Sequence, residues 1–90
     1  MIYALTRQAE EDLIHIYLYG SELFGSLQAE KYYTSLENAF ERIAKNPEMY
    51  PIAFEIRLGY RYCVHSAHTI FFTVEQEVKI IRIIGKQRFP

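Results

Sequence analysis

Two long segments of the chain repeat apolar residues with the period of an α-helix. In the first, from Arg7 onward, small or apolar residues recur at steps of three or four: Ala9, Leu13, Ile16, Gly20 and Leu23. Acidic residues crowd its first turns, where they favour the positive end of the helix dipole. The Thr6 hydroxyl can accept a hydrogen bond from a first-turn amide. We therefore predict a helix that begins after Thr6 and is broken at Gly25.

The second helical segment, LQAEKYYTSLENAFERIAKN, follows at once, and Ser26 is its predicted N-cap. Its apolar positions are Ala29, Tyr32 or Tyr33, Leu36, Ala39 or Phe40, and Ile43. The segment should end at Asn46-Pro47, because proline cannot continue a helix. Two helices joined by so short a link form an antiparallel hairpin. The residues from Met49 to Ala53 are then a connecting loop.

The stretch from Glu55 to Lys86 has the shorter period of β-strands. Its runs of Tyr, Val, Ile, Phe and Thr are interrupted at Ser66-Ala67-His68 and at Glu75-Gln76-Glu77, which predicts a three-stranded antiparallel meander. The N-terminal run from Ile2 to Thr6 should add a fourth strand, in a pairing order that remains open. The helical hairpin needs an apolar partner, and the sheet is the only large one. The predicted fold class is α+β, with the helices packed on one face.

Side-chain alternation divides each strand between two faces of the sheet. Ile70, Phe72 and Val74 share one face of their strand, and we expect this more apolar set to point towards the helices. On the last strand the even-numbered and odd-numbered residues compete for the inner face. A shift by one residue would exchange them, so this register remains open.

Length and composition are those of one small domain spanning residues 1–90, half of it apolar. The apolar runs are far shorter than the roughly 20 residues that cross a bilayer, so no membrane segment is expected. The N-terminus has no basic region followed by an apolar stretch, as a secretory signal would. A cytoplasmic location is expected.

The net charge of −1 is the balance of two unequal halves. Residues 1–51 hold 4 basic against 8 acidic residues, whereas residues 52–90 hold 6 basic against 3 acidic residues. Proteins that bind nucleic acid through its phosphates usually carry a strong overall positive charge. We therefore expect no direct sequence-specific binding of nucleic acid.

The residues with chemical potential are few. Cys63 is the only cysteine, which excludes an internal disulfide, and its apolar surroundings favour a small core residue over a nucleophile. His65 and His68 flank a predicted turn and, with His15, lack the spacing of a metal site. No P-loop or dinucleotide fingerprint occurs, so no metal and no cofactor are expected.

Basic residues of the strand half remain as candidates for binding a partner. Arg61, Arg82, Lys86 and Arg88 could form a patch for an acidic protein surface or a phosphate backbone. The structural alternative is an ion pair across the core, for which Asp12 is a plausible partner of Arg61 or Arg82. Both interpretations stay open at this point.

The order and spacing of several short motifs resemble the RelE/ParE toxin superfamily, and its ParE branch in particular. The motifs are Ala9-Glu10-Glu11-Asp12-Leu13, Asn46-Pro47, Gly59-Tyr60-Arg61, His68-Thr69-Ile70-Phe71-Phe72 and Ile80-Ile81-Arg82-Ile83-Ile84. The resemblance covers nearly the whole chain and implies a toxin of a type II toxin-antitoxin system. ParE-like members block DNA gyrase, whereas RelE-like members cleave mRNA on the ribosome.

The residues that the resemblance assigns to mRNA cleavage are missing at matching positions. Thr69 stands where RelE-like chains carry an arginine at the strand entry. RelE-like chains carry a further basic residue after the Gly-Lys that follows the last strand, where this chain has Gly85-Lys86-Gln87. The RelE-like helix with its catalytic tyrosine has no counterpart up to Pro90. Among ParE-like chains many have a histidine where Gly85 stands here. The resemblance thus implies a gyrase inhibitor that is not an enzyme.

The resemblance also implies a ParD-like antitoxin whose C-terminal segment lays an amphipathic helix in a groove, or adds a strand at a sheet edge. Arg61, Arg82, Lys86 and Arg88 are predicted to contact the target. Tyr17, Tyr19, Tyr32 and Tyr33 are predicted anchors for the antitoxin, with core or rim packing as the alternative. Two other functions stay open: a ribosome-dependent endoribonuclease using Arg61 or Arg82 with His65 or His68, and an inactive relative that only binds antitoxin.

Overall fold

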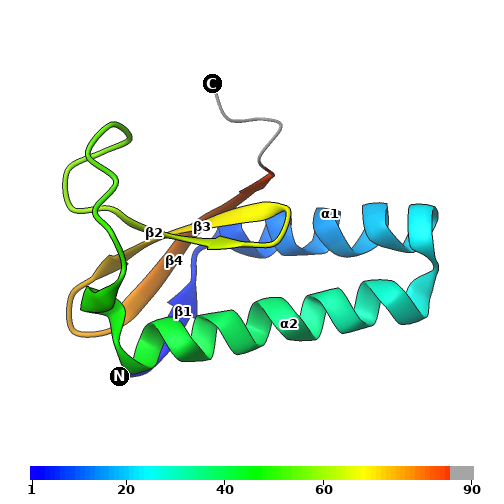
Figure 1. Ribbon diagram of the computed structural model, residues 1–90, viewed down its shortest axis with the longest axis horizontal. Coiled ribbons are helices and arrows are strands. Elements are labelled where there is room, and N and C mark those ends of the chain that lie inside the picture. Colours follow the sequence, from blue (N-terminus) through cyan, green and yellow to red (C-terminus); the bar gives the residue numbers. More distant parts are fainter. Residues whose placement is uncertain (86–90) are drawn as a thin grey trace.

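A computed structural model describes residues 1–85 and shows the predicted α+β architecture (Figure 1). The elements are β1 (Tyr3–Leu5), α1 (Arg7–Phe24), α2 (Ser26–Lys45), the short 3₁₀ helix η1 (Pro47–Met49), β2 (Arg61–His65), β3 (His68–Val74) and β4 (Val78–Gly85). The two helices form an antiparallel hairpin that extends beyond the sheet at its far end.

The sheet has the strand order β1-β4-β3-β2. The last three strands form the predicted antiparallel meander, and β1 adds next to β4 in parallel, with Tyr3 opposite Val78. The predicted start of the meander at Glu55 is wrong, because residues 54–60 form turns and the strand begins at Arg61. These turns supply local partners for the backbone, since the amides of Ile56 and Arg57 both donate to the Ala53 carbonyl.

Gly25 joins the two helices without a linker. Its amide donates to the Ser21 carbonyl and closes α1, while its own carbonyl accepts from the Ala29 amide and opens α2. Its φ of +88° lies in the region that favours glycine. Ser26 was the expected N-cap of the second helix, and this prediction is wrong, because Gly25 occupies the cap position and Ser26 is already helical.

The core lies between α2 and the middle of the sheet. It includes Leu36, Phe40 and Ile43 of α2, packed in one cluster with Ile70 and Phe72 of β3 and with Val78 and Ile80 of β4. The prediction that Ile70, Phe72 and Val74 face the helices is confirmed. Leu23 is more than half exposed, because the end of α1 lies beyond the sheet.

A β-bulge decides the register of β4. Phe71 lies opposite Arg82 and Phe72 opposite Ile80, so Ile81 is an extra residue in β4. The buried positions of the strand are consequently Val78 and Ile80 before the bulge and Ile83 after it. Each of the two possible inner faces is therefore used along half of the strand.

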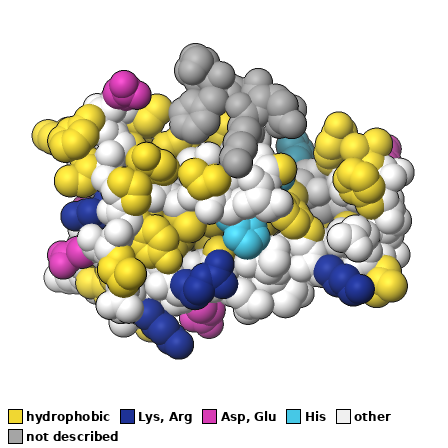
Figure 2. Space-filling model, viewed as in Figure 1, with side chains coloured by type: hydrophobic (Ala, Val, Ile, Leu, Met, Phe, Trp, Pro, Cys, Tyr) yellow, Lys and Arg dark blue, Asp and Glu magenta, His cyan; other side chains and the backbone are white. Residues whose placement is uncertain are grey.

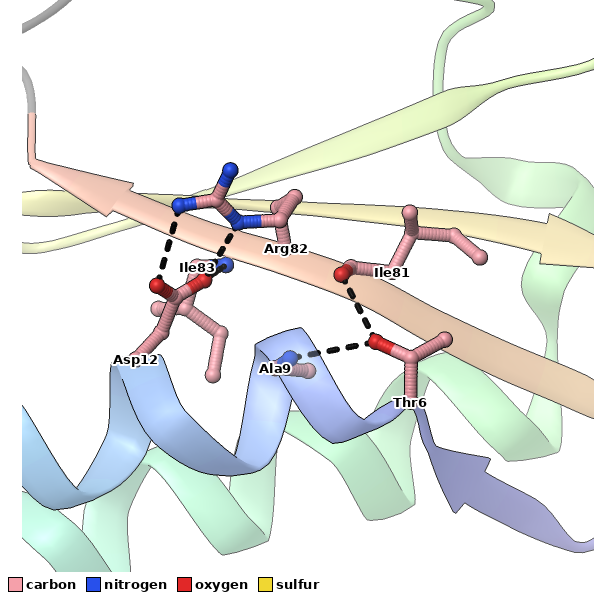
Figure 3. Close-up of polar contacts among 6 residues, drawn as sticks. All are labelled: Thr6, Ala9, Asp12, Ile81, Arg82 and Ile83. Carbon is pink, nitrogen blue, oxygen red and sulfur yellow. Dashed lines mark hydrogen bonds and ion pairs between the residues drawn. The ribbon is translucent and has the colours of Figure 1, made fainter.

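Where β1 stops, the residue before α1 takes over the hydrogen bonding along the same edge of β4 (Figure 3). The Thr6 amide donates to the Ile80 carbonyl at 3.0 Å, and the Thr6 hydroxyl donates to the Ile81 carbonyl at 2.9 Å. The same hydroxyl oxygen accepts from the Ala9 amide at 3.1 Å, which confirms the predicted N-cap. One threonine thus begins the helix and ties it to the sheet.

Further along α1, Asp12 also forms hydrogen bonds with this edge of β4 (Figure 3). Its Oδ2 atom accepts from the Ile83 amide at 2.9 Å and from Arg82 Nε at 2.7 Å, while its Oδ1 atom accepts from Arg82 Nη2 at 3.0 Å. The Asp12 side chain is only 16% exposed. A carboxylate therefore satisfies a backbone donor of β4 that β1 is too short to reach.

We expect Asp12→Ala to lower the free energy of unfolding by about 2–3 kcal/mol, because it removes charge-assisted hydrogen bonds and leaves the Ile83 amide unpaired. Urea denaturation at neutral pH measures this change. Glu11→Ala is the matched control, since Glu11 makes only an exposed 3.9 Å contact with Arg7 and should change stability by less than about 0.5 kcal/mol. Equal losses in the two variants would contradict this account of α1.

Candidate functional site

Two of the predicted target-binding residues, Arg61 and Arg82, lie in the described part of the chain, and each has a contact within it. Arg82 forms the bidentate pair with Asp12 described above, and these hydrogen bonds raise the pKa of its guanidinium. Arg61 Nη1 donates to the Tyr50 carbonyl at 2.6 Å. The ion pair expected for Arg61 or Arg82 thus forms with Arg82. Lys86 and Arg88 lie outside the described residues, and contact of all four with the target stays a prediction.

The four tyrosines predicted as antitoxin anchors do not share one surface. Tyr17 and Tyr33 are half-buried and meet edge to face, with ring centroids 6.1 Å apart. Tyr19 is exposed, and Tyr32 turns towards the β2–β3 hairpin. Only the pair of Tyr17 and Tyr33 is brought together by the fold.

A groove of about 370 Å³ lies between α1, α2 and β1. Its lining comes from all three elements: Tyr3 and Leu5 of β1, Glu10, Leu13 and Ile14 of α1, and Tyr33, Glu37 and Phe40 of α2. We call it the acidic groove, because apolar side chains dominate the lining and both of its charged residues are exposed carboxylates. β1 is one of the two edge strands of the sheet, so the groove also borders a sheet edge.

The electrostatics of the acidic groove are visible at Tyr3. Burial and the nearby carboxylates of Glu41 and Glu37 raise the pKa of its phenol, and its ring packs on Phe40 with centroids 5.5 Å apart. A negative potential over apolar side chains suits a ligand that offers an apolar stripe flanked by cations. Residues 1–85 hold no group of three or more His, Cys, Asp or Glu residues that could bind a metal ion.

A polar cluster that the sequence did not reveal pins the β2–β3 hairpin to α2. Tyr32 Oη lies 2.7 Å from His68 Nδ1 and donates to the His65 carbonyl at 3.3 Å. Ser35 Oγ lies 2.9 Å from His65 Nε2. The histidines flank a turn, as predicted, but they are half-buried rather than simple surface groups. The helical spacing of Tyr32 and Ser35 is their only signal in the sequence.

Burial affects the titration of this region. It lowers the pKa of His65, with a contribution from the Arg42 charge, and it lowers the pKa of His68, with a contribution from His65. Burial also raises the pKa of the Cys63 thiol, which packs against the core. Cys63 is thus a half-buried residue at the margin of the core rather than one of its fully buried members.

Fold and surface define a small α+β protein in which a helical hairpin covers a four-stranded sheet and borders an open acidic groove. Among residues 1–85, no helix is long and apolar enough to cross a membrane. Residues 3–88 match the family described as ParE toxin of type II toxin-antitoxin system, parDE.

Individual relatives agree with this match. Toxin ParE1 of Caulobacter vibrioides is 37% identical over 82 residues, which cover 91% of this chain and 85% of that protein. Toxin ParE1 of Mycobacterium tuberculosis is 33% identical over 87 residues, which cover 94% of this chain and 89% of that protein. The chain therefore belongs to the ParE toxin family of type II toxin-antitoxin systems.

A solved structure shows the same fold. The chain superposes on one from the chromosomal ParDE TA system of P. aeruginosa with a TM-score of 0.84 and 23% identity, over 94% of this chain and 95% of that one. The resemblance to the RelE/ParE superfamily and the predicted α+β fold are both confirmed.

The lowered histidine pKa values predict that stability falls in mild acid. In the unfolded chain a histidine titrates near 6.5, whereas His65 and His68 titrate lower in the folded chain. The unfolded state then binds more protons between the folded pKa and 6.5. The contribution of these histidines to the free energy of unfolding is therefore fully present above pH 6.5, and it decreases as the pH falls below that value.

Urea denaturation between pH 7.5 and pH 5.5 measures this slope. His68→Gln should flatten it, because it removes one of the two groups that resist protonation in the folded chain. His15→Gln on the exposed face of α1 is the matched control and should leave the slope as it is in the unaltered protein. A slope that His15→Gln flattens as much would contradict the assignment to the hairpin cluster.

Proposed function

We propose that this ParE-family toxin arrests growth by binding DNA gyrase without covalent chemistry of its own, and that a ParD-like antitoxin neutralises it by docking in the acidic groove. Membership of the ParE family supports DNA gyrase as the target. The acidic groove supports the docking of the antitoxin.

The acidic groove fits an amphipathic segment of opposite charge. Leu13, Ile14 and Phe40 offer an apolar lining, while Glu10 and Glu37 offer carboxylates from the two helices. An antitoxin segment with an apolar stripe and flanking Lys or Arg side chains complements both features. The outer edge of β1 borders the same groove, so an extended part of that segment can add as a further strand.

Inhibition by binding rather than by cleavage agrees with how Arg61 and Arg82 are used. Phosphate cleavage without a metal requires cationic side chains that are directed at the phosphate. Here Arg82 is directed at Asp12, and Arg61 is directed at the Tyr50 carbonyl. This arrangement favours a toxin whose surface, and not a reaction centre, acts on its target.

Charge reversal in the acidic groove tests the antitoxin proposal. We expect Glu10→Lys with Glu37→Lys to weaken antitoxin binding at least about tenfold at low salt, because like charges then face each other across the contact. Glu22→Lys with Glu30→Lys is the matched control, since it changes the same charge on the same helices at exposed positions that do not line the groove. Titration calorimetry with the product of the adjacent reading frame measures both, and equal weakening would place the antitoxin elsewhere.

Supercoiling by purified gyrase tests the target. We expect the toxin to reduce supercoiling and to cause cleavage complexes to accumulate, and added antitoxin to reverse both effects. Undiminished supercoiling at excess toxin would reject gyrase as the target. Transcript cuts at translated codons after expression would favour the endoribonuclease instead, and expression without growth arrest would favour an inactive antitoxin-binding relative.

A further inference from the structure

The segment between η1 and β2 exposes large apolar side chains to solvent. Leu58 is 93% exposed and Phe54 is 78% exposed, and Ile52 and Ile56 are also exposed. We call residues 52–60 the apolar loop. It projects from the sheet at the end of the molecule opposite the tip of the helical hairpin (Figure 1), and Figure 2 shows hydrophobic side chains gathered at that end.

The apolar loop is held in shape by its own backbone. The Ala53 amide donates to the Tyr60 carbonyl at 2.7 Å across its base, and the Tyr60 amide donates to the Arg57 carbonyl at 3.2 Å. Ala53 is buried, and Arg61 Nη1 bonds the Tyr50 carbonyl next to the loop. Its apolar side chains are thus presented by an ordered support, which reduces the entropy lost when a partner binds.

The exposed area is large for a protein of this size. With Met49 included, the side chains of this segment expose on the order of 600 Å², taking about 200 Å² for a fully exposed large apolar side chain. As a sum over separate side chains, this area is comparable with the largest apolar patches found on monomers, which are about 300–600 Å² and often functional. It is also most of the roughly 800 Å² that one partner contributes to a standard interface.

Charge separates this surface from the acidic groove. The two charged residues between Phe54 and Leu58 are the exposed Glu55 and Arg57, whose charges cancel. A basic antitoxin segment gains no electrostatic energy here, whereas it does at Glu10 and Glu37. The two surfaces therefore suit different partners.

The shape of the loop argues against a second copy as its partner. A projecting loop needs a concave apolar pocket, and a loop seated in the groove of another copy makes a head-to-tail contact, which forms a ring or an open chain rather than a two-fold dimer. The groove of this chain also carries the carboxylates of Glu10 and Glu37, to which the neutral loop offers no net positive charge. A different protein with an apolar pocket meets the requirement.

We propose that the apolar loop is the element by which the toxin inserts into an apolar pocket of its protein target, with Arg61 as a positioning residue at its base. This proposal rests on the proposed function for the identity of the target, but not for the position of the contact. Arg61, which was predicted to contact the target, then acts indirectly by supporting the loop.

The test compares two double variants that remove exposed apolar side chains. Phe54→Ser with Leu58→Ser alters the apolar loop, and Leu23→Ser with Phe24→Ser alters exposed residues at the hairpin tip. We expect the loop variant to abolish growth arrest and to raise the concentration that half-inhibits gyrase at least about tenfold. Antitoxin affinity should be unchanged in both variants, which also shows that they fold, and the tip variant should keep full toxicity.

Arg61 needs a readout that a structural role alone would not move. Arg61→Gln should weaken gyrase inhibition while antitoxin affinity stays the same, and Arg61→Lys should restore part of it through a single donor to the Tyr50 carbonyl. Inhibition by the unaltered toxin should change little with salt, because the contact is apolar and carries no net charge.

Several outcomes would overturn the proposal. If the loop variant still arrests growth, or if it loses antitoxin affinity, the loop is not the contact with the target. The same conclusion follows if sedimentation shows that the unaltered toxin is a dimer and the loop variant a monomer. If the unaltered toxin arrests growth but leaves gyrase unaffected, gyrase inhibition is rejected, and growth arrest in the two double variants still decides the role of the loop. An unaltered toxin without growth arrest would overturn both.

Discussion

The structure depends on how the second edge of β4 is completed. β4 has eight residues and its neighbour β1 has three, so most of that edge lies beyond β1. Thr6 and Asp12 fill part of the difference by bonding the backbone of Ile80, Ile81 and Ile83. Because buried backbone groups must find partners, α1 is held along this edge, and α2 is then placed over the face of the sheet. The acidic groove is the space that remains between the two helices and β1.

The protein presents two surfaces that differ in their physics. The acidic groove combines an apolar lining with unbalanced negative charge, so binding there should respond to salt. The apolar loop is neutral and projects from the sheet, so its binding energy should come from burial of apolar area. Two of the predicted target-binding residues also stabilise this arrangement, Arg82 through Asp12 and Arg61 through Tyr50. A toxin that must be both active and neutralisable can use separate surfaces for the two tasks.

The positions of the elements follow from the sequence more closely than the contacts between them. The Thr6 cap, the end of α2 before Pro47 and both meander turns are predictable, because caps, prolines and turn residues act within a few positions. The hydrogen-bond network of Tyr32, Ser35, His65 and His68 is not, because the partners in these contacts are 30 to 36 residues apart. The predicted start of the meander at Glu55 is wrong, since apolar residues in the loop have the composition of a strand.

The sequence by itself determined the fold class and the family, because the helical and strand periods and the order of the motifs are local properties of the chain. Only the tertiary structure decided which arginine pairs with Asp12, which face of β4 is buried and where the charged groove lies. A bulge at Ile81 exchanges the inner face halfway along β4, and no local pattern marks it. Asp12 and Arg82 are 70 residues apart, so their pairing exists only once α1 lies against the edge of β4.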